Sequence, residues 1–236
     1  DRGGLATVGN APRIISTAWD VHRMRRMKTQ VLVVGSGPTG ASAAVFLARH
    51  GVEVMLVSRS RWVSDTPRAH ITNARTMEIL RNVGLESQCL AKASANAFQA
   101  NKVWVTTMAG EELGRLMSWG NHPARRAEYE LASPARMCDL PQWHLEPILL
   151  NEAARLGASL RFDTELRGFS QDADGVRARV VDLLSGEETE VHCDYLVAGD
   201  GGRSPVAAAL QLPMEGEAGM GTAINVLFDA DLTGFV

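Results

Sequence analysis

Three glycines with the spacing G-x-G-x-x-G follow a short apolar run near the start of the chain. The apolar run covers residues 30–34, and the glycines come directly after it. The first glycine permits a tight turn, the second lets the backbone approach a pyrophosphate, and the third lets a helix pack closely on the strand. The N-terminus of that helix offers free N–H groups to phosphate oxygens. The residues predicted to bind a nucleotide here are Gly35, Gly37, Pro38, Thr39 and Gly40.

A second apolar run ends in a glycine turn that carries a carboxylate. Residues 195–198 precede Gly199, Asp200 and Gly201. An aspartate before a glycine is also a common turn residue, but the apolar run before it favours a cofactor contact for Asp200 and Gly201. A nicotinamide enzyme needs only the first glycine loop. Two such loops, far apart in the chain, predict a large two-ended cofactor such as FAD.

The expected partner of the ribose is missing. In dinucleotide-binding folds an acidic residue stands about 20 residues past the glycine loop, at the end of the second strand. Here that place holds Ser58 and Arg59. Ser58 is predicted to bond a ribose hydroxyl, or it simply ends a strand. The Ser-Arg-Ser-Arg run at residues 58–61 would also suit a 2′-phosphate, so an NADP-linked dehydrogenase stays an alternative.

The pattern of apolar residues predicts strands that alternate with helices. Residues 30–34, 39–50 and 52–57 form one strand–helix–strand unit with a right-handed crossover, and Gly51 caps its helix. This indicates an α/β fold with a parallel sheet. Further elements are expected in chain order: a helix within residues 71–83 that starts at Asn73, a β-hairpin of residues 102–108 and 113–117, a solvated loop at 125–130, a helix capped by Asp139 with Pro141 early in it and ending at Gly157, strands at 159–162, 165–171, 176–184, 188–192 and 195–198, and a short helix at 204–210.

Composition excludes several classes of protein. The chain has 236 residues and a net charge of −3, which favours neither a nucleic-acid binder nor an acidic disordered tail. No apolar run approaches the ~18–20 residues that a membrane span needs. The three cysteines are widely spaced without a CxxC pair, so neither a disulfide framework nor a metal site is expected. We expect reduced thiols and a cytoplasmic protein.

The sequence also predicts a domain organisation. Residues 1–28 are expected to be a flexible tail or a non-native extension, because they are aperiodic and then basic. Residues 29–212 are expected to form the nucleotide-binding domain, interrupted by a β-hairpin around 101–118. Residues 213–236 would begin a substrate-binding domain with a new strand from Thr222. Since that strand has no visible partner, the chain is expected to be the head of a longer protein.

The chain resembles the N-terminal part of the class A flavoprotein monooxygenases, the para-hydroxybenzoate hydroxylase and phenol hydroxylase superfamily. Within it, residues 64–70 and 134–142 look closest to bacterial chlorophenol- and phenol-hydroxylating members. The resemblance implies a Rossmann-like FAD-binding domain with an inserted β-rich substrate region. Ser58 and Ala207 depart from the family, which has a carboxylate and an arginine there. The matching blocks are residues 33–40, 67–69, 75–80, 195–204 and Gln142 with 145–149.

The resemblance also implies a reaction and roles for three further residues. NAD(P)H would reduce FAD, and oxygen would form a flavin hydroperoxide that hydroxylates a phenol. Gln142 would contact the flavin. Arg68 would bind the FAD pyrophosphate or NAD(P)H, or is a surface arginine. His70 would be a base near the substrate hydroxyl, or is a surface histidine.

Other functions stay open from the sequence. A different FAD oxidoreductase of the same fold, such as an epoxidase or a prenyl reductase, would share every motif above. A separate alternative is an inactive fragment that only binds a nucleotide or binds nothing. The ring substituents and the choice of NADH or NADPH are not determined by these residues. Nor is the oligomeric state, for which a homo-oligomer is one option.

Overall fold

The computed structural model describes residues 24–66, 68–217, 219, 221, 222, 224, 226 and 228–234. Contacts divide the chain into two compact units. The first unit is formed by the described residues of Asp1–Trp62 and Glu152–Gly216, and the second by those of Val63–Asn151 and Glu217–Val236. Most of the predicted tail lies outside the described residues, and the predicted domain boundaries stay predictions.

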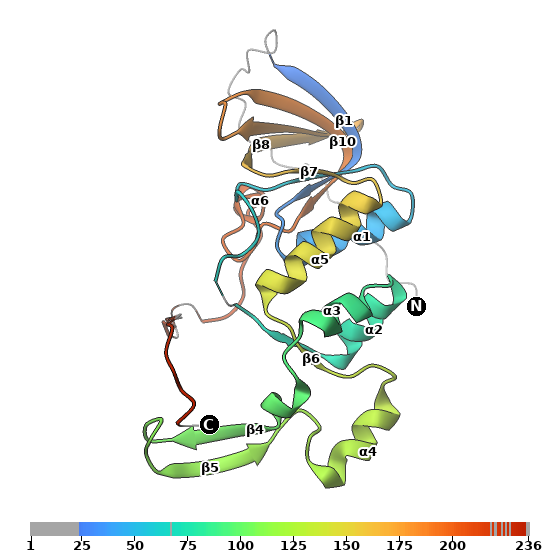
Figure 1. Ribbon diagram of the computed structural model, residues 1–236. Helices are drawn as coiled ribbons and strands as arrows, with labels where there is room; N and C mark the ends of the chain where they lie inside the picture. The colour runs from blue at the N-terminus through green and yellow to red at the C-terminus, as the bar shows by residue number, and fades with distance from the viewer. Residues whose placement is uncertain are drawn as a thin grey trace, which may run out of the picture. The chain divides into compact units, whose positions relative to one another are not determined.

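A six-stranded mixed sheet forms the body of the first unit, with the order β7-β2-β1-β10-β9-β8 (Figure 1). The first four of these strands are parallel to their neighbours, while β8, β9 and β10 pair antiparallel. The carboxyl ends of the four parallel strands therefore meet at one edge, where α/β sheets bind ligands. The strands are β1 (Arg25–Val34), β2 (Val54–Val57), β7 (Ser159–Arg161), β8 (Thr164–Asp172), β9 (Gly175–Asp182) and β10 (Glu188–Ala198).

The predicted strand–helix–strand unit is present. The helix α1 (Pro38–Arg49) joins β1 to β2, and proline at its first position suits helix entry. The four residues of β2 and the last four of β1 are all buried, as expected for strands covered on both faces. The helix ends before Gly51, whose φ is +77°. The buried side chains on one side of the sheet include Leu32, Met55, Val57, Ala178, Val180 and Val191.

Two strand predictions need correction. Residues 188–192 and 195–198 were expected as separate strands but are one continuous strand, β10. Cys193 pairs with Thr29 in β1 and with Val176 in β9, so the backbone stays extended through the junction. This long partner also extends β1, which begins at Arg25 rather than Gln30. Residues 25–28 of the predicted tail are therefore part of the sheet.

The second unit consists of helices and two small sheets. β3 (Ile71–Thr72) pairs antiparallel with β6 (Cys138–Asp139). β4 (Asn101–Val105) and β5 (Glu112–Met117) form the predicted hairpin, although β4 ends three residues earlier than expected and β5 begins one residue earlier (Figure 1). Asn73 caps α2 as predicted, because its Oδ1 accepts the Thr76 N–H at 2.8 Å. The helices are α2 (Ala74–Asn82), α3 (Glu86–Lys92), the 3₁₀ turn η1 (Asn96–Gln99), α4 (Pro123–Ala132) and α5 (Gln142–Arg155), which continues into the first unit.

Three further expectations fail in this part of the chain. The loop predicted at residues 125–130 is the helix α4. Its side chains are exposed, as expected for the solvated segment, but Arg126 pairs with Glu130 one turn later. Asp139 was expected to cap α5 but lies in β6. The described residues at 222, 224, 226 and 228–230 form no strand; residues 223, 225 and 227 lie outside the described part. No described helix has the length and apolar character needed to cross a bilayer.

Candidate nucleotide-binding site

The two predicted glycine loops meet at the carboxyl edge of the sheet. Gly35 has a φ of +103° and donates its N–H to the carbonyl of Val57 at 2.8 Å. A Cβ atom on Gly35 would overlap the carbonyl oxygen of Gly199, and one on Gly199 would lie 2.8 Å from the Gly40 nitrogen. These glycines are therefore required for close packing of the backbones.

The start of α1 is suited to an anion. Gly37 is the N-cap residue and offers no side-chain acceptor to the helix. Pro38 has no N–H, so the free donors of the first turn are the backbone N–H groups of Thr39 and Gly40. The structure describes every residue in the first turn of α1, and none of them is acidic. A phosphate oxygen would satisfy these donors and favour the positive end of the helix dipole.

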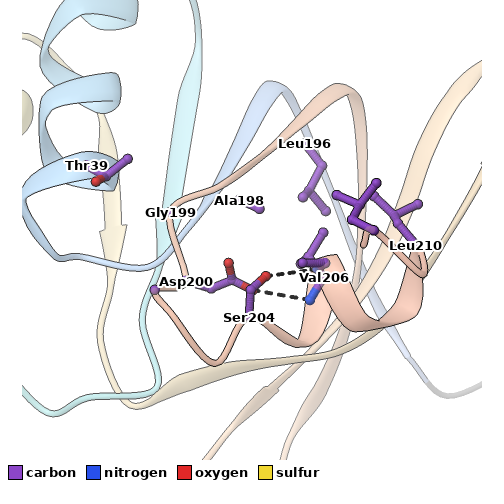
Figure 2. Close-up of a pocket in the computed structure, with 11 residues that line it drawn as sticks. Thr39, Leu196, Ala198, Gly199, Asp200, Ser204, Val206 and Leu210 are labelled. Carbon is purple, nitrogen blue, oxygen red and sulfur yellow. Dashed lines mark hydrogen bonds between the residues drawn. The ribbon is translucent and has the colours of Figure 1, made fainter. Parts of the chain in front are cut away.

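Asp200 organises the second loop. Its Oδ2 accepts a hydrogen bond from the Ser204 hydroxyl at 2.8 Å and another from the Val206 N–H at 3.2 Å, as Figure 2 shows. The Ser204 hydroxyl in turn accepts the Ala207 N–H at 2.9 Å and caps the short helix α6 (Pro205–Ala209). Among the described residues no donor reaches the second oxygen, Oδ1, which stays available to a ligand.

A cavity of about 450 Å³ lies between this loop, α6 and the start of α1 (Figure 2). Its volume is within the range of small-molecule sites. Ala207 lines it, and the described lining holds no basic side chain. The wall is mostly apolar, with polar groups from Thr39, Asp200 and Ser204. The remaining lining residues are Leu196, Ala198, Gly199, Gly201, Val206, Leu210 and Leu212.

Ser58, the predicted ribose contact, is buried at the end of β2. Its hydroxyl lies 2.8 Å from the hydroxyl of Ser36 in the first glycine loop, and it accepts the Ser60 N–H at 3.3 Å. Both serine side chains are nearly inaccessible. The hydroxyl of Ser58 thus fastens the glycine loop to β2, a pairing that sequence reasoning missed. Arg59 beside it is exposed.

The remaining predicted residues lie in the second unit. The Gln142 N–H donates to the Ala69 carbonyl at 3.1 Å, which brings Gln142 close to the segment that holds Arg68 and His70. Arg68 is exposed and pairs with no carboxylate in the described part of the chain. The glycine loops belong to the first unit, so the predicted site residues fall into two separate groups.

His70 has an acidic partner. Its Nδ1 lies 2.7 Å from Oδ1 of Asp139, and the Leu140 N–H donates to the His70 carbonyl at 2.7 Å. The side chain of His70 is 58% exposed, while that of Asp139 is 18% exposed. A carboxylate on Nδ1 favours the tautomer that carries its proton there, which leaves Nε2 free to accept a proton. The two residues are 69 positions apart, so no local signal in the sequence could pair them.

Gln142 is held by a buried carboxylate. Its Nε2 donates to Oε1 of Glu146 at 2.6 Å, and Oε2 of Glu146 accepts the Ser64 N–H at 2.6 Å. Glu146 is only 2% exposed. Sequence reasoning missed Glu146, although its spacing of four residues from Gln142 places both on one face of the helix. The network fixes the orientation of the Gln142 amide.

The cysteines offer no nucleophile. All three are free thiols and buried. Burial, followed by the charge of nearby groups, raises the pKa of Cys89 and the pKa of Cys138 to about 11. Burial also raises the pKa of Cys193. The thiols are therefore protonated at neutral pH, and the thiolate is the reactive form.

Four parallel strands, a glycine-rich strand-to-helix turn and a second glycine loop packed against that turn define a dinucleotide-binding α/β protein. The sequence profile of the FAD binding domain family matches residues 28–236. The chain belongs to this family. This finding confirms the predicted fold class and the predicted resemblance.

Curated relatives lie in the branch that the sequence indicated. The chain is 50% identical to 2,4-dichlorophenol 6-monooxygenase of Delftia acidovorans over 210 residues. The match covers 89% of this chain and 36% of that protein. It is 46% identical over 207 residues to phenol 2-monooxygenase of Pseudomonas sp. strain EST1001, covering 88% of this chain and 32% of that protein. The chain thus spans about a third of the length of these relatives.

Solved structures agree with the fold. The flavin-dependent monooxygenase PieE, crystallised with FAD and substrate, matches with a TM-score of 0.79 and 40% identity over 82% of this chain and 34% of that one. Aklavinone-11 hydroxylase, in a ternary complex with FAD and aklavinone, matches with a TM-score of 0.69 and 36% identity over 80% of this chain and 36% of that one.

Proposed function

We propose that the full-length protein containing this chain is an FAD-dependent monooxygenase that hydroxylates a phenolic ring. The observation that carries the proposal is the junction of the two glycine loops at Gly35 and Gly199, next to the cavity beside Asp200. Similarity to two phenol-type monooxygenases supports the substrate class. When bound, FAD would accept electrons from NAD(P)H and activate oxygen, with a flavin hydroperoxide as the proposed oxygen donor.

The residues of the first unit would hold the cofactor. The free N–H groups of Thr39 and Gly40 would bind the pyrophosphate, and the turn at Gly35 and Gly37 would let the phosphates approach the backbone. The apolar walls of the cavity would exclude water from the cofactor, while Oδ1 of Asp200 offers an acceptor to its hydroxyl groups. The described glycine packing thus fits a dinucleotide.

The residues of the second unit would act on the substrate and the flavin. Nε2 of His70, held in its tautomer by Asp139, would accept the proton of the phenol hydroxyl, because a phenolate ring is more electron-rich. Gln142, oriented by Glu146, would donate or accept a hydrogen bond at the flavin. Arg68 would supply a positive charge to the FAD pyrophosphate or to NAD(P)H.

The test uses the purified full-length protein with FAD. We expect a yellow protein whose oxidation of NADH or NADPH is stimulated by phenol or 2,4-dichlorophenol, with one atom of ¹⁸O₂ appearing in the hydroxylated product. Oxidation without incorporation of ¹⁸O into any phenol tried would contradict hydroxylation and favour another FAD oxidoreductase, such as an epoxidase or a prenyl reductase. A colourless protein that binds only NADP would favour a dehydrogenase.

A further inference from the structure

An aromatic pair stands at the carboxyl edge of the first unit, beyond the glycine loop. The rings of Trp62 and Phe162 lie with their centroids 5.0 Å apart at an interplanar angle of 49°. Trp62 follows β2 and is 53% exposed, while Phe162 follows β7 and is half-buried. A large indole that contacts a second ring and is still 53% exposed has surface left for another planar group.

Backbone hydrogen bonds fix the two segments that carry these rings. The Ser58 N–H donates to the Arg161 carbonyl at 2.8 Å, and the Thr164 N–H donates back to the Ser58 carbonyl at 2.8 Å. The Asp163 N–H adds a bond to the Ser60 carbonyl at 3.2 Å. The loop after β2 and the turn after β7 therefore form one rigid ledge.

The ledge is joined directly to the glycine loop. The Gly35 N–H donates to the Val57 carbonyl, and the hydroxyls of Ser36 and Ser58 lie 2.8 Å apart. A dinucleotide with its pyrophosphate at the start of α1 places its ribose at the end of β2. Since β7 is the neighbour of β2 on the side away from β1, the base beyond that ribose would lie over the ledge.

The adenosine end of a bound FAD would lack the usual carboxylate partner of its ribose. The carboxylate that would bind the ribose is replaced by Ser58, whose hydroxyl is already paired with Ser36 and accepts the Ser60 N–H. Arg59 and Arg61 are exposed on the same loop and pair with no described carboxylate, so they add donors but no acceptor for the ribose hydroxyls. Stacking of the base on an aromatic ring supplies binding energy that does not depend on such an acceptor.

We propose that Trp62, supported by Phe162, stacks against the adenine ring of FAD and holds the adenosine end of the cofactor in place of the missing ribose carboxylate. This inference rests on the proposed binding of FAD. It assigns to Trp62 a role in the affinity for the cofactor and none in the chemistry of the flavin.

The test compares FAD with FMN, which has the same flavin but no adenine. In the full-length protein stripped of cofactor, Trp62→Leu is expected to weaken FAD binding about tenfold, since a stacked base contributes on the order of 1–3 kcal/mol. Trp62→Phe keeps an aromatic face and should weaken it less. Binding of FMN should not change. Dissociation constants come from quenching of flavin fluorescence.

Trp104→Leu is the matched control, because Trp104 is 48% exposed and lies in the second unit. It should bind FAD as the wild type does. Equal FAD affinity of the wild type and Trp62→Leu would overturn the inference and leave the proposed function standing, as would an equal loss for FAD and FMN. A wild-type protein that binds neither flavin would instead overturn the proposed function. Unfolding curves in urea should be the same for Trp62→Leu and the wild type. A large loss of stability in Trp62→Leu would show that Trp62 serves to shield Phe162 from water and not to bind the cofactor.

Discussion

The carbonyl oxygen of Gly199 occupies the space that a Cβ atom on Gly35 would need. Gly35 belongs to the turn between β1 and α1, whereas Gly199 follows β10, which is parallel to β1. The N–H of Gly199 donates to the Val34 carbonyl at 2.8 Å, so the two turns are joined by a hydrogen bond as well as by contact. The two glycine loops are therefore fixed against each other.

This contact predicts that Gly35→Ala damages both stability and cofactor binding. Alanine would carry the strain of a φ of +103° and would also push against Gly199. We expect a loss of about 2–4 kcal/mol in the free energy of unfolding, measured in urea. Gly51→Ala is the control, because Gly51 has a φ of +77° with open space around it. It should cost about 1 kcal/mol. Equal losses at both positions would mean that the contact with Gly199 contributes nothing.

The buried hydroxyl pair predicts coupling between Ser36 and Ser58. Removing either hydroxyl leaves the other buried without its partner, which costs about 1–3 kcal/mol. Ser58→Ala should cost more than Ser36→Ala, because it also removes the acceptor of the Ser60 N–H. The double variant should lose less stability than the sum of the two single variants. Unfolding free energies of all four proteins test this, and strict additivity would exclude the pairing.

Much of the first unit could be predicted from local sequence, and the reason is physical. The end of β1, α1 and β2 are marked by continuous apolar runs and by glycines that the turn requires, so pattern and structure agree. The continuity of β10 could not be predicted, because Asp194 interrupts the apolar pattern while the backbone continues to pair with β1. The helix α4 was missed because the charged residues at 125, 126, 128 and 130 suggested a solvated loop, and α4 indeed buries no side chain.

Local sequence patterns were also insufficient to predict the contacts between site residues. Single residues could be proposed for the site where a motif surrounds them, as with Asp200 and the glycines. Their partners were missed because pairing depends on the tertiary fold: Ser36 with Ser58, and His70 with Asp139, are joined across 22 and 69 positions. Sequence reasoning could thus select segments for the predicted site but could not say which side chains were already engaged.

The loop at Asp200 predicts different effects for two neighbouring substitutions. Asp200→Ala and Ser204→Ala each remove hydrogen bonds at the start of α6, so both should lower stability by about 1 kcal/mol. Only Asp200 offers a further carboxylate oxygen to the cavity. We therefore expect Asp200→Ala to weaken FAD binding clearly more than Ser204→Ala in fluorescence titrations. An equal effect of both variants would show that Asp200 acts only by shaping the loop.

The buried thiols predict a loss of stability in alkali. The pKa of Cys89 is raised from 9.0 to about 11 in the folded protein, so the folded state keeps a proton that the unfolded state releases. Its contribution is complete below pH 9 and is lost as the pH rises from about 9 to about 11. The difference in unfolding free energy between the wild type and Cys89→Ala should therefore shrink over this range. A difference independent of pH would contradict the raised pKa.

The pair formed by His70 and Asp139 predicts a change of tautomer when the carboxylate becomes an amide. In the wild type, donation from Nδ1–H to Asp139 leaves Nε2 bare, and ¹⁵N shifts of the ring should show this form. In Asp139→Asn the amide NH₂ can donate to Nδ1 and so favour the proton on Nε2, which can then no longer accept the phenol proton. We expect kcat of the full-length protein to fall at least tenfold, since the same exchange costs a serine protease about 10⁴.

Two comparisons separate this role from a structural one. Asp65→Asn changes an exposed carboxylate of the same segment and should alter neither the ring shifts nor kcat. Asp139→Asn should keep the unfolding free energy within about 1 kcal/mol of the wild type, because the amide has nearly the same shape as the carboxylate and its partner His70 is 58% exposed to water. If Nε2 carries the proton in the wild type, or if kcat is unchanged in Asp139→Asn, His70 does not serve as a base positioned by Asp139. A fall in kcat that accompanies the change of tautomer, with stability preserved, would link the geometry of this pair to proton transfer.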